Sequence, residues 1–150
     1  MKSHTQVVII GGGSLGISLL YHLTKEGWTD LLLVEKGELT SGSTWHAAGL
    51  CSNFIGNMTV AKIHDYSIRL YNEILPEETG EESSFHQTGS IRIGYSRLEE
   101  EWFRNLDSRA KNVPCEFNII SQAEAQDLHP WANFDKARII VSTPNDGHVD

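Results

Sequence analysis

The spacing of three glycines near the amino terminus is the feature that most restricts the fold. Gly11, Gly13 and Gly16 follow the apolar run Gln6–Ile10 and precede a segment whose leucines recur at helical spacing. The first glycine permits a sharp turn out of a strand, the second lets a diphosphate approach the backbone, and the third lets the helix pack closely on the sheet. The motif therefore predicts a strand–turn–helix corner that binds the diphosphate of a dinucleotide.

A second apolar strand completes this unit. Leu31–Val34 follows the helix, and Glu35 stands directly after it, 19 residues beyond Gly16. The order strand–helix–strand, with strands that are apolar throughout, is typical of parallel strands buried on both faces. An acid at this position accepts hydrogen bonds from ribose hydroxyls and disfavours a 2′-phosphate, so the pattern predicts FAD or NAD and not NADP.

The loop over residues 36–57 is rich in Gly, Ser and Thr and shows neither helical nor strand spacing. Long loops inside compact domains are usually functional. Within it, His46 lies between Trp45 and a run of three small residues, a composition that suits a backbone lying against a flat ring system such as a flavin. The alternative is a solvated surface histidine, the commoner state of a lone histidine in a loop.

Short helices and strands alternate in the rest of the chain. The spacing predicts an amphipathic helix over 58–75, with Ile63 in its apolar stripe, that Pro76 ends or kinks. A second helix is predicted over 98–111, with Trp102, Phe103 and Leu106 on its buried side, and a capped helix over 121–128. Between and after these helices the pattern predicts a strand or hairpin over 85–94, strands over 117–120 and 137–142, and a turn over 143–147. Only one complete βαβ unit is present, and no closing element is predicted after the last turn. We therefore expect this chain to be the first part of a longer polypeptide.

Charge and composition narrow the choice of partners. A formal net charge of −8 disfavours a nucleic-acid partner, and no apolar run approaches the length of a membrane span. The start of the chain carries neither a secretory nor a transit signal, so we expect a bacterial cytoplasmic protein, with the mitochondrial matrix as the alternative. Cys51 and Cys115 are expected to be reduced thiols, and the histidines lack zinc-ligand spacing, so no metal site is predicted.

Five segments resemble the N-terminal region of the dimethylglycine dehydrogenase and sarcosine dehydrogenase family. They are VVIIGGGSLG, VEKGELTSGSTWHAAGL, EETG, FHQTGSIRI and NDGHVD, in the family's order and spacing through essentially the whole chain. The resemblance implies an α/β fold with a Rossmann-like FAD-binding unit of the glutathione-reductase or D-amino-acid-oxidase type, followed by the start of an α+β substrate domain. Residues 1–57 would belong to the FAD-binding domain and residues 58–150 to its continuation towards the substrate side.

The resemblance also implies a set of cofactor contacts. His46 would bond covalently to the flavin 8α carbon, Ser14 and Leu15 would touch the diphosphate, and Lys36 would flank the ribose beside Glu35. The flavin would be wrapped by Gly42, Ser43, Thr44, Trp45, His46, Ala47, Ala48, Gly49 and Leu50. Cys51 is a rival attachment point, because cysteinyl flavin bonds exist.

Family membership implies oxidative N-demethylation of dimethylglycine or sarcosine, with hydride transfer from the N-methyl carbon to the flavin. Tetrahydrofolate held by a downstream domain and an electron-transfer flavoprotein are the further partners implied, and the 150 residues alone are expected to be inactive. Two alternatives remain open: an FAD-containing regulatory protein of the pyruvate dehydrogenase phosphatase type, and a D-amino-acid dehydrogenase-like enzyme with dissociable FAD. No catalytic residue is assigned. His86 and Arg92 are expected to be ordinary strand residues, and His148 a turn residue. The alternatives are that Arg92 pairs with a substrate carboxylate and that His148 lines the substrate site.

Overall fold

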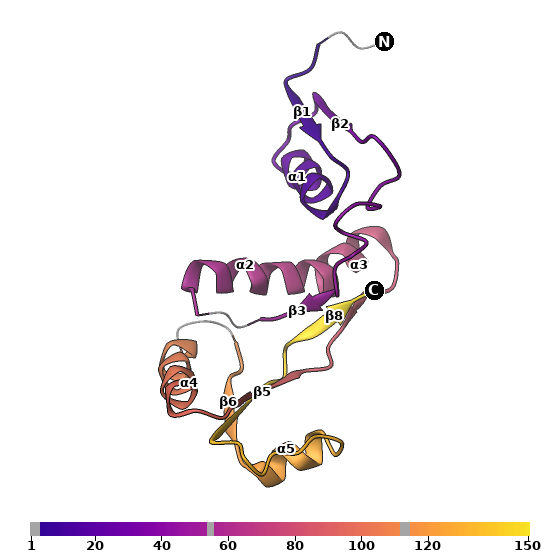
Figure 1. The fold of residues 1–150 in the computed structure, drawn as a ribbon. Coiled ribbons are helices and arrows are strands. Elements are labelled where there is room, and N and C mark those ends of the chain that lie inside the picture. Colours follow the sequence, from indigo (N-terminus) through magenta and orange to yellow (C-terminus); the bar gives the residue numbers. More distant parts are fainter. Residues whose placement is uncertain (1–3, 54–55, 112–114) are drawn as a thin grey trace. The chain divides into compact units, whose positions relative to one another are not determined.

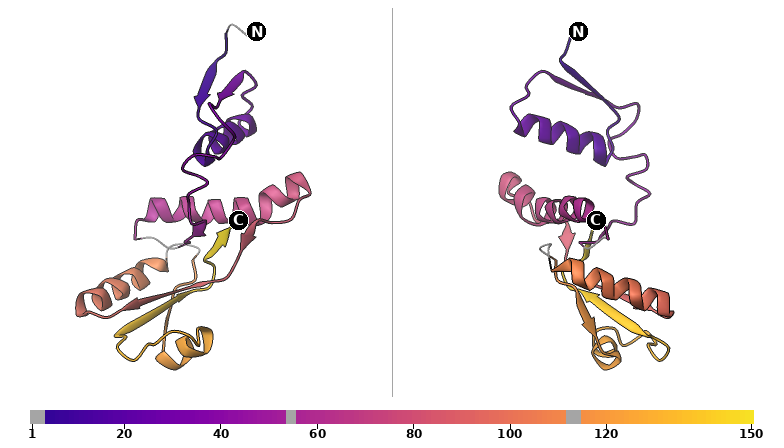
Figure 2. Two further views of the ribbon diagram at one scale, coloured as in Figure 1. Left: turned by 45° about the vertical axis from the view of Figure 1, so that its right-hand side comes forward. Right: turned by 90° about the vertical axis from the view of Figure 1, so that its left-hand side faces the viewer.

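The computed structural model describes residues 4–53, 56–111 and 115–150, and the chain divides into two compact units. The first unit ends at Ala48 and the second begins at Gly49. Figure 1 follows the chain through both units, and Figure 2 shows the same elements from two further sides.

The first unit is the predicted strand–helix–strand motif. Strand β1 (Val7–Ile10) pairs in parallel with β2 (Leu31–Val34), in a register that sets Val7 opposite Leu31 and Ile10 opposite Val34. Helix α1 (Ser14–Lys25) connects the two strands and contacts both (Figure 1). The predicted βαβ unit is therefore confirmed.

The burial of these two strands differs from the expectation. Ile9 is buried, but Val8 and Leu32 are exposed and the Ile10 side chain is 86% exposed. Burial on both faces is wrong for the unit as described, because two strands and a single helix can cover only one face of a sheet.

The second unit contains two three-stranded antiparallel sheets. One has the order β3 (Leu50–Cys51), β8 (Gly147–Val149), β4 (Phe85–His86), and the other has the order β5 (Ser90–Gly94), β7 (Ile139–Thr143), β6 (Asn118–Ile120).

This topology decides one expectation and corrects two. Of the strand or hairpin predicted over 85–94, strands are confirmed and a hairpin is not formed, because β4 and β5 pair with different partners. The loop over 36–57 contains the short strand β3, which two residues are too few to reveal by alternation. A strand, β8, does follow the last turn, and it joins β3 to β4.

The core of the second unit surrounds β7, the central strand of its sheet. Alternate residues of β7 face opposite sides: Ile139 and Val141 pack with the helix α4 (Arg97–Ala110), and Ile140 packs with α5 (Gln122–Leu128). Figure 2 shows the two helices on either side of this sheet. All five residues of β7 are buried, including the polar Ser142 and Thr143.

Both of these helices begin with a capping box. The box formed by Ser121 and Glu124 at α5 was predicted and is confirmed, and a second one, formed by Ser96 and Glu99, opens α4. The predicted buried face of α4 is partly wrong: the Trp102 side chain is 53% exposed, whereas Phe103 and Leu106 are buried.

The long helical segment of the second unit runs through Pro76. Helix α2 (Met58–Arg69) continues as a π-helical turn over Leu70–Ile74 and then as α3 (Leu75–Thr79). Of the two outcomes predicted for Pro76, an end or a kink, the end is wrong, because the helical segment continues to Thr79. The proline lies in the first turn of α3, and the wider π turn directly precedes it.

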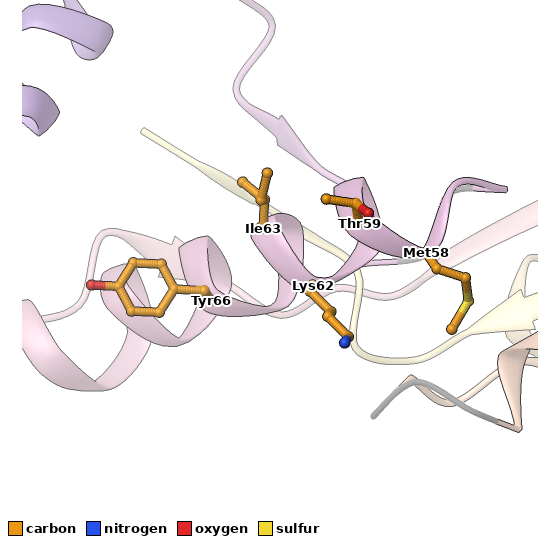
Figure 3. Close-up of a pocket in the computed structure, with 5 residues that line it drawn as sticks. All are labelled: Met58, Thr59, Lys62, Ile63 and Tyr66. Atoms are coloured by element: carbon orange, nitrogen blue, oxygen red, sulfur yellow. The ribbon is translucent and has the colours of Figure 1, made fainter.

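One face of α2 lines a pocket of about 460 Å³, and Figure 3 shows its lining residues: Met58, Thr59, Lys62, Ile63 and Tyr66. The predicted apolar stripe of this helix includes Ile63, yet that side chain is exposed, and Ala61 and Ile68 are buried instead. None of the predicted cofactor residues belongs to this pocket. Among the described residues, every helix is too short or too polar to cross a membrane.

Candidate functional site

The turn over residues 11–16, here called the glycine corner, joins β1 to α1 and brings their backbones into direct contact. The N–H of Gly11 donates to the carbonyl of Val34 at 2.8 Å, which extends the β1–β2 pairing into the turn. A Cβ atom at Gly16 would overlap the carbonyl oxygen of Gly11. Only glycine lets the helix start this close to the strand, as the fingerprint predicts.

Glu35 is tied to the same corner by backbone donors. Its carboxylate accepts hydrogen bonds from the N–H of Gly12 at 2.6 Å and of Gly37 at 2.9 Å. These two donors, the Gly12 N–H first, hold the pKa of Glu35 below its ordinary value of 4.5. A carboxylate has about four acceptor positions, so the predicted bonds to ribose hydroxyls can form beside these two.

The lowered pKa of Glu35 predicts a specific acid sensitivity. Because the folded-state pKa lies below the unfolded value, the ionised carboxylate stabilises the fold above pH 4.5, and that contribution is lost as the pH falls through the folded value. We expect Glu35→Gln to melt at a lower temperature than the wild-type full-length protein at neutral pH. The difference in melting temperature between the variant and the wild type should become smaller as the pH falls below 4.5, as measured by thermal melting.

The matched control for this experiment is Glu38→Gln, a change at an exposed position in the same loop. The melting temperature of Glu38→Gln should differ from that of the wild type by an amount that stays the same across this pH range. A difference in melting temperature between Glu35→Gln and wild type that stays constant below pH 4.5 would contradict the role of the ionised carboxylate.

The loop that follows β2 is anchored to the glycine corner at two points. The N–H of Thr40 donates to the carbonyl of Gly12 at 2.9 Å, and the N–H of Ser14 donates to the Thr44 hydroxyl oxygen at 2.9 Å. Thr44 thus satisfies one of the free N–H groups at the start of α1, a helix whose own N-cap residue has no side chain. The sequence carries no local signal for this contact, since the partners are 30 residues apart.

His46 lies in a run of tight turns within this loop. Its Nδ1 is 2.9 Å from the carbonyl oxygen of Gly42, and its backbone N–H donates to the carbonyl of Ser43. A carbonyl oxygen can only accept, so Nδ1 carries the hydrogen and Nε2 keeps its lone pair. The neighbouring Trp45 ring is centred 6.4 Å from the imidazole, and both side chains are exposed.

The corner and the loop together enclose a cavity of about 640 Å³. Of the predicted cofactor residues, it is lined by Gly11, Gly13, Ser14, Leu15, Gly16, Glu35, Lys36, Gly42, Ser43, Thr44 and Ala47. Ser41 and Thr40 also line it and were not predicted. The helix start, the glycine turn and the acid meet at one cavity, so the residues present fit the ADP half of FAD. Trp45, His46 and Ala48 do not line it.

Two further predicted residues, Gly49 and Leu50, belong to the second unit. Gly49 has a φ of +69°, and its carbonyl accepts a hydrogen bond from the N–H of Val149 at 2.9 Å. A Cβ there would overlap the carbonyl oxygen of Val149, so glycine is needed for both backbone angle and space. Leu50 starts β3, and its side chain is 80% exposed.

Cys51 is a poor nucleophile in this structure. Burial, with the nearby charge of Asp146, raises the pKa of its thiol above 9.0, and its Sγ lies 3.5 Å from the carbonyl of Gly49. Burial also raises the pKa of Cys115 to about 11. Because the thiolate is the reactive form, these shifts disfavour Cys51 as the flavin attachment point relative to His46.

The structure changes the interpretation of Arg92, His86 and His148. Arg92 is expected to be an ordinary strand arginine, but its side chain is only 26% exposed and pairs with the buried Asp146 at 3.1 Å. His148 lies in the strand β8, directly opposite His86, and the two rings stack with centroids 5.0 Å apart. The turn composition of residues 143–147 gave no sign of the buried carboxylate at Asp146.

Comparison with known proteins agrees with this geometry. Rat dimethylglycine dehydrogenase (mitochondrial) is 45% identical over 149 residues, which cover 99% of this chain and 17% of that protein. Human sarcosine dehydrogenase (mitochondrial) is 35% identical over 150 residues, or 100% of this chain and 16% of that protein. The resemblance seen in the motifs is therefore confirmed, and the chain spans about a sixth of the length of these relatives.

Solved structures and family models identify the fold. The crystal structure of L-proline dehydrogenase from P. horikoshii superimposes with a TM-score of 0.88 and 24% identity, over 100% of this chain and 39% of that one. The model of the FAD dependent oxidoreductase family matches residues 6–150. The predicted D-amino-acid-oxidase-like α/β fold is thereby confirmed. This chain belongs to the family of FAD-dependent oxidoreductases.

Proposed function

We propose that the full-length protein oxidises an N-methylated glycine, dimethylglycine or sarcosine, with FAD bonded covalently to His46. Support for the substrate class comes from the 45% identity to a protein named dimethylglycine dehydrogenase. Support for the attachment comes from the hydrogen bond between His46 Nδ1 and the Gly42 carbonyl, which leaves Nε2 as the nucleophilic nitrogen. The sequence identity carries the substrate class, and this hydrogen bond is the single structural observation that carries the attachment.

The chain contributes cofactor placement to this reaction. The helix start at Ser14 would bind the diphosphate, Glu35 the ribose, and the anchored loop would hold His46 beside the ring system. When bound, FAD supplies the two-electron acceptor. Oxidation removes a hydride from the N-methyl carbon, and the nitrogen lone pair stabilises the cation that develops there.

Two other partners belong to the same proposal. Tetrahydrofolate would capture the one-carbon unit in a later part of the full-length protein, and an electron-transfer flavoprotein would take the electrons. A bacterial cytoplasmic location, or the mitochondrial matrix in a eukaryote, would suit both partners.

Anaerobic reduction of the flavin in the full-length protein tests the proposed activity. Dimethylglycine or sarcosine is expected to bleach the visible flavin absorption. Betaine is the matched control: it has a third N-methyl group and no nitrogen lone pair, so it should leave the absorption unchanged. Absence of bleaching with every methylated glycine would refute the enzyme and favour a regulatory flavoprotein.

A further inference from the structure

Thr40, in the loop of the first unit, has a backbone conformation that threonine rarely adopts. Its φ is +64°, and among the described residues it is the only one besides glycines with a positive φ. The backbone crowds a β-branched side chain in this left-handed region, so the conformation is strained and persists only where the surrounding structure fixes it. Residues strained in this way cluster at sites that bind ligands, so Thr40 is a candidate for such a role.

Two backbone hydrogen bonds fix Thr40 in this conformation. Its N–H donates to the carbonyl of Gly12 at 2.9 Å, and its carbonyl accepts from the N–H of Trp45 at 3.0 Å. The preceding residue, Leu39, packs on the same glycine, because a Cβ atom added to Gly12 would lie 2.5 Å from the Leu39 Cδ2. The glycine corner and the next turn of the loop therefore hold the strained residue from both sides.

Thr40 lies beside the acid that is expected to bind the ribose. The N–H of Gly12 donates to the Glu35 carboxylate at 2.6 Å, so Glu35 and Thr40 are bonded to the two backbone polar groups of one residue. Both line the cavity of about 640 Å³ that fits the ADP half of FAD, and all of these residues belong to the first unit. Thr40 is exposed, and within the described part of the chain its hydroxyl has no hydrogen-bond partner. That hydroxyl can therefore bond to a ligand in the cavity.

We infer that Thr40 is a cofactor-binding residue whose hydroxyl bonds to the ADP half of FAD, and that its backbone strain results from placing the hydroxyl there. A hydroxyl can donate to a diphosphate oxygen and can exchange hydrogen bonds with a ribose hydroxyl, and both groups belong to this half. Thr40 lies outside residues 42–50, which the family resemblance implies as flavin contacts. The inference rests on family membership and on the cavity, and it does not depend on the proposed substrate or on the bond to His46.

The test measures ADP binding and thermal melting of the full-length protein, made free of flavin by expression in a host starved of riboflavin. Thr40→Gly removes both the strain and the hydroxyl, so it should melt at a higher temperature than wild type and yet bind ADP about tenfold more weakly in calorimetric titration. Thr40→Val keeps the branched side chain and loses only the hydroxyl, so it should weaken ADP binding by a similar factor. Thr40→Ser keeps the hydroxyl and should bind ADP as wild type does.

Glu38→Gly is the matched control, because it makes the same kind of change in the same loop at a residue that has no positive φ and does not line the cavity. Glycine adds freedom to the unfolded chain, so this variant should melt at or below the wild-type temperature. Its affinity for ADP should equal that of wild type.

The outcomes separate this inference from the proposed function. Wild-type ADP affinity in Thr40→Gly and Thr40→Val would overturn the inference, and so would a Thr40→Gly protein that melts below wild type. Should Thr40→Gly fail to fold, the other two variants decide, because equal ADP affinity in Thr40→Val and Thr40→Ser refutes the role of the hydroxyl. If the wild type and the variants bind ADP as expected but no methylated glycine reduces the flavin, the proposed function fails and this inference stands.

Discussion

Replacing Gly16 with alanine is expected to abolish flavin binding by the full-length protein. A Cβ at this position would overlap the carbonyl oxygen of Gly11 and would also meet the Ile9 side chain at 3.5 Å. The obstacle is backbone, so α1 must move away from β1, and overpacking of this kind costs about 1–3 kcal/mol. The movement also displaces the helix start that would bind the diphosphate. The measurement is the flavin content of the purified protein, from its visible absorption.

Ser18→Thr is the matched control for this change. It also adds one methyl group to α1, but on the exposed side of the helix. It should purify with the same flavin content as wild type. A yellow Gly16→Ala protein with full flavin content would show that the close contact of α1 and β1 is not needed for cofactor binding.

Replacing His46 with alanine is expected to remove covalent flavin completely while leaving some FAD bound without a covalent link. The anchors of the loop, Thr40 on Gly12 and Thr44 on Ser14, do not involve the imidazole, so the cavity for the ADP half should survive. The midpoint potential of the remaining flavin should fall, because the bond to the 8α carbon is lost. Acid precipitation separates the two forms: the pellet of the variant should be colourless and the supernatant yellow.

His129→Ala is the control for loss of a histidine, since His129 is exposed at the end of α5 and has no assigned role. Its acid pellet should stay yellow. Covalent flavin retained in His46→Ala would place the attachment elsewhere, and Cys51 would then be the residue to replace next.

The elements that the sequence predicts well are those with a local pattern. The βαβ unit follows from two apolar strand segments, helical spacing and the glycine fingerprint, and the cap of α5 follows from Ser121 and Glu124 alone. Where the pattern is local but the outcome depends on neighbours, the prediction is only partly right. Trp102 has the spacing of a core residue, yet the sheet beneath α4 accommodates Phe103 and Leu106 instead.

The contacts that hold the candidate site together could not be predicted in this way. Thr44 is an ordinary polar loop residue until the fold brings it to the N–H of Ser14. Asp146 belongs to a sequence typical of a turn, and it does form one, but its carboxylate is satisfied by donors as far away as Asn53, 93 residues earlier. Such contacts have no periodicity or fixed spacing, so only the folded chain reveals them.

The most direct test of the account is the mass of the peptide that carries His46. The full-length holoprotein is denatured in acid, digested with a protease, and its peptides are weighed by mass spectrometry. The account predicts that the flavin is found on the peptide spanning residues 42–50, bonded to His46. A His46 peptide of unmodified mass, from a protein that purifies yellow, would contradict it.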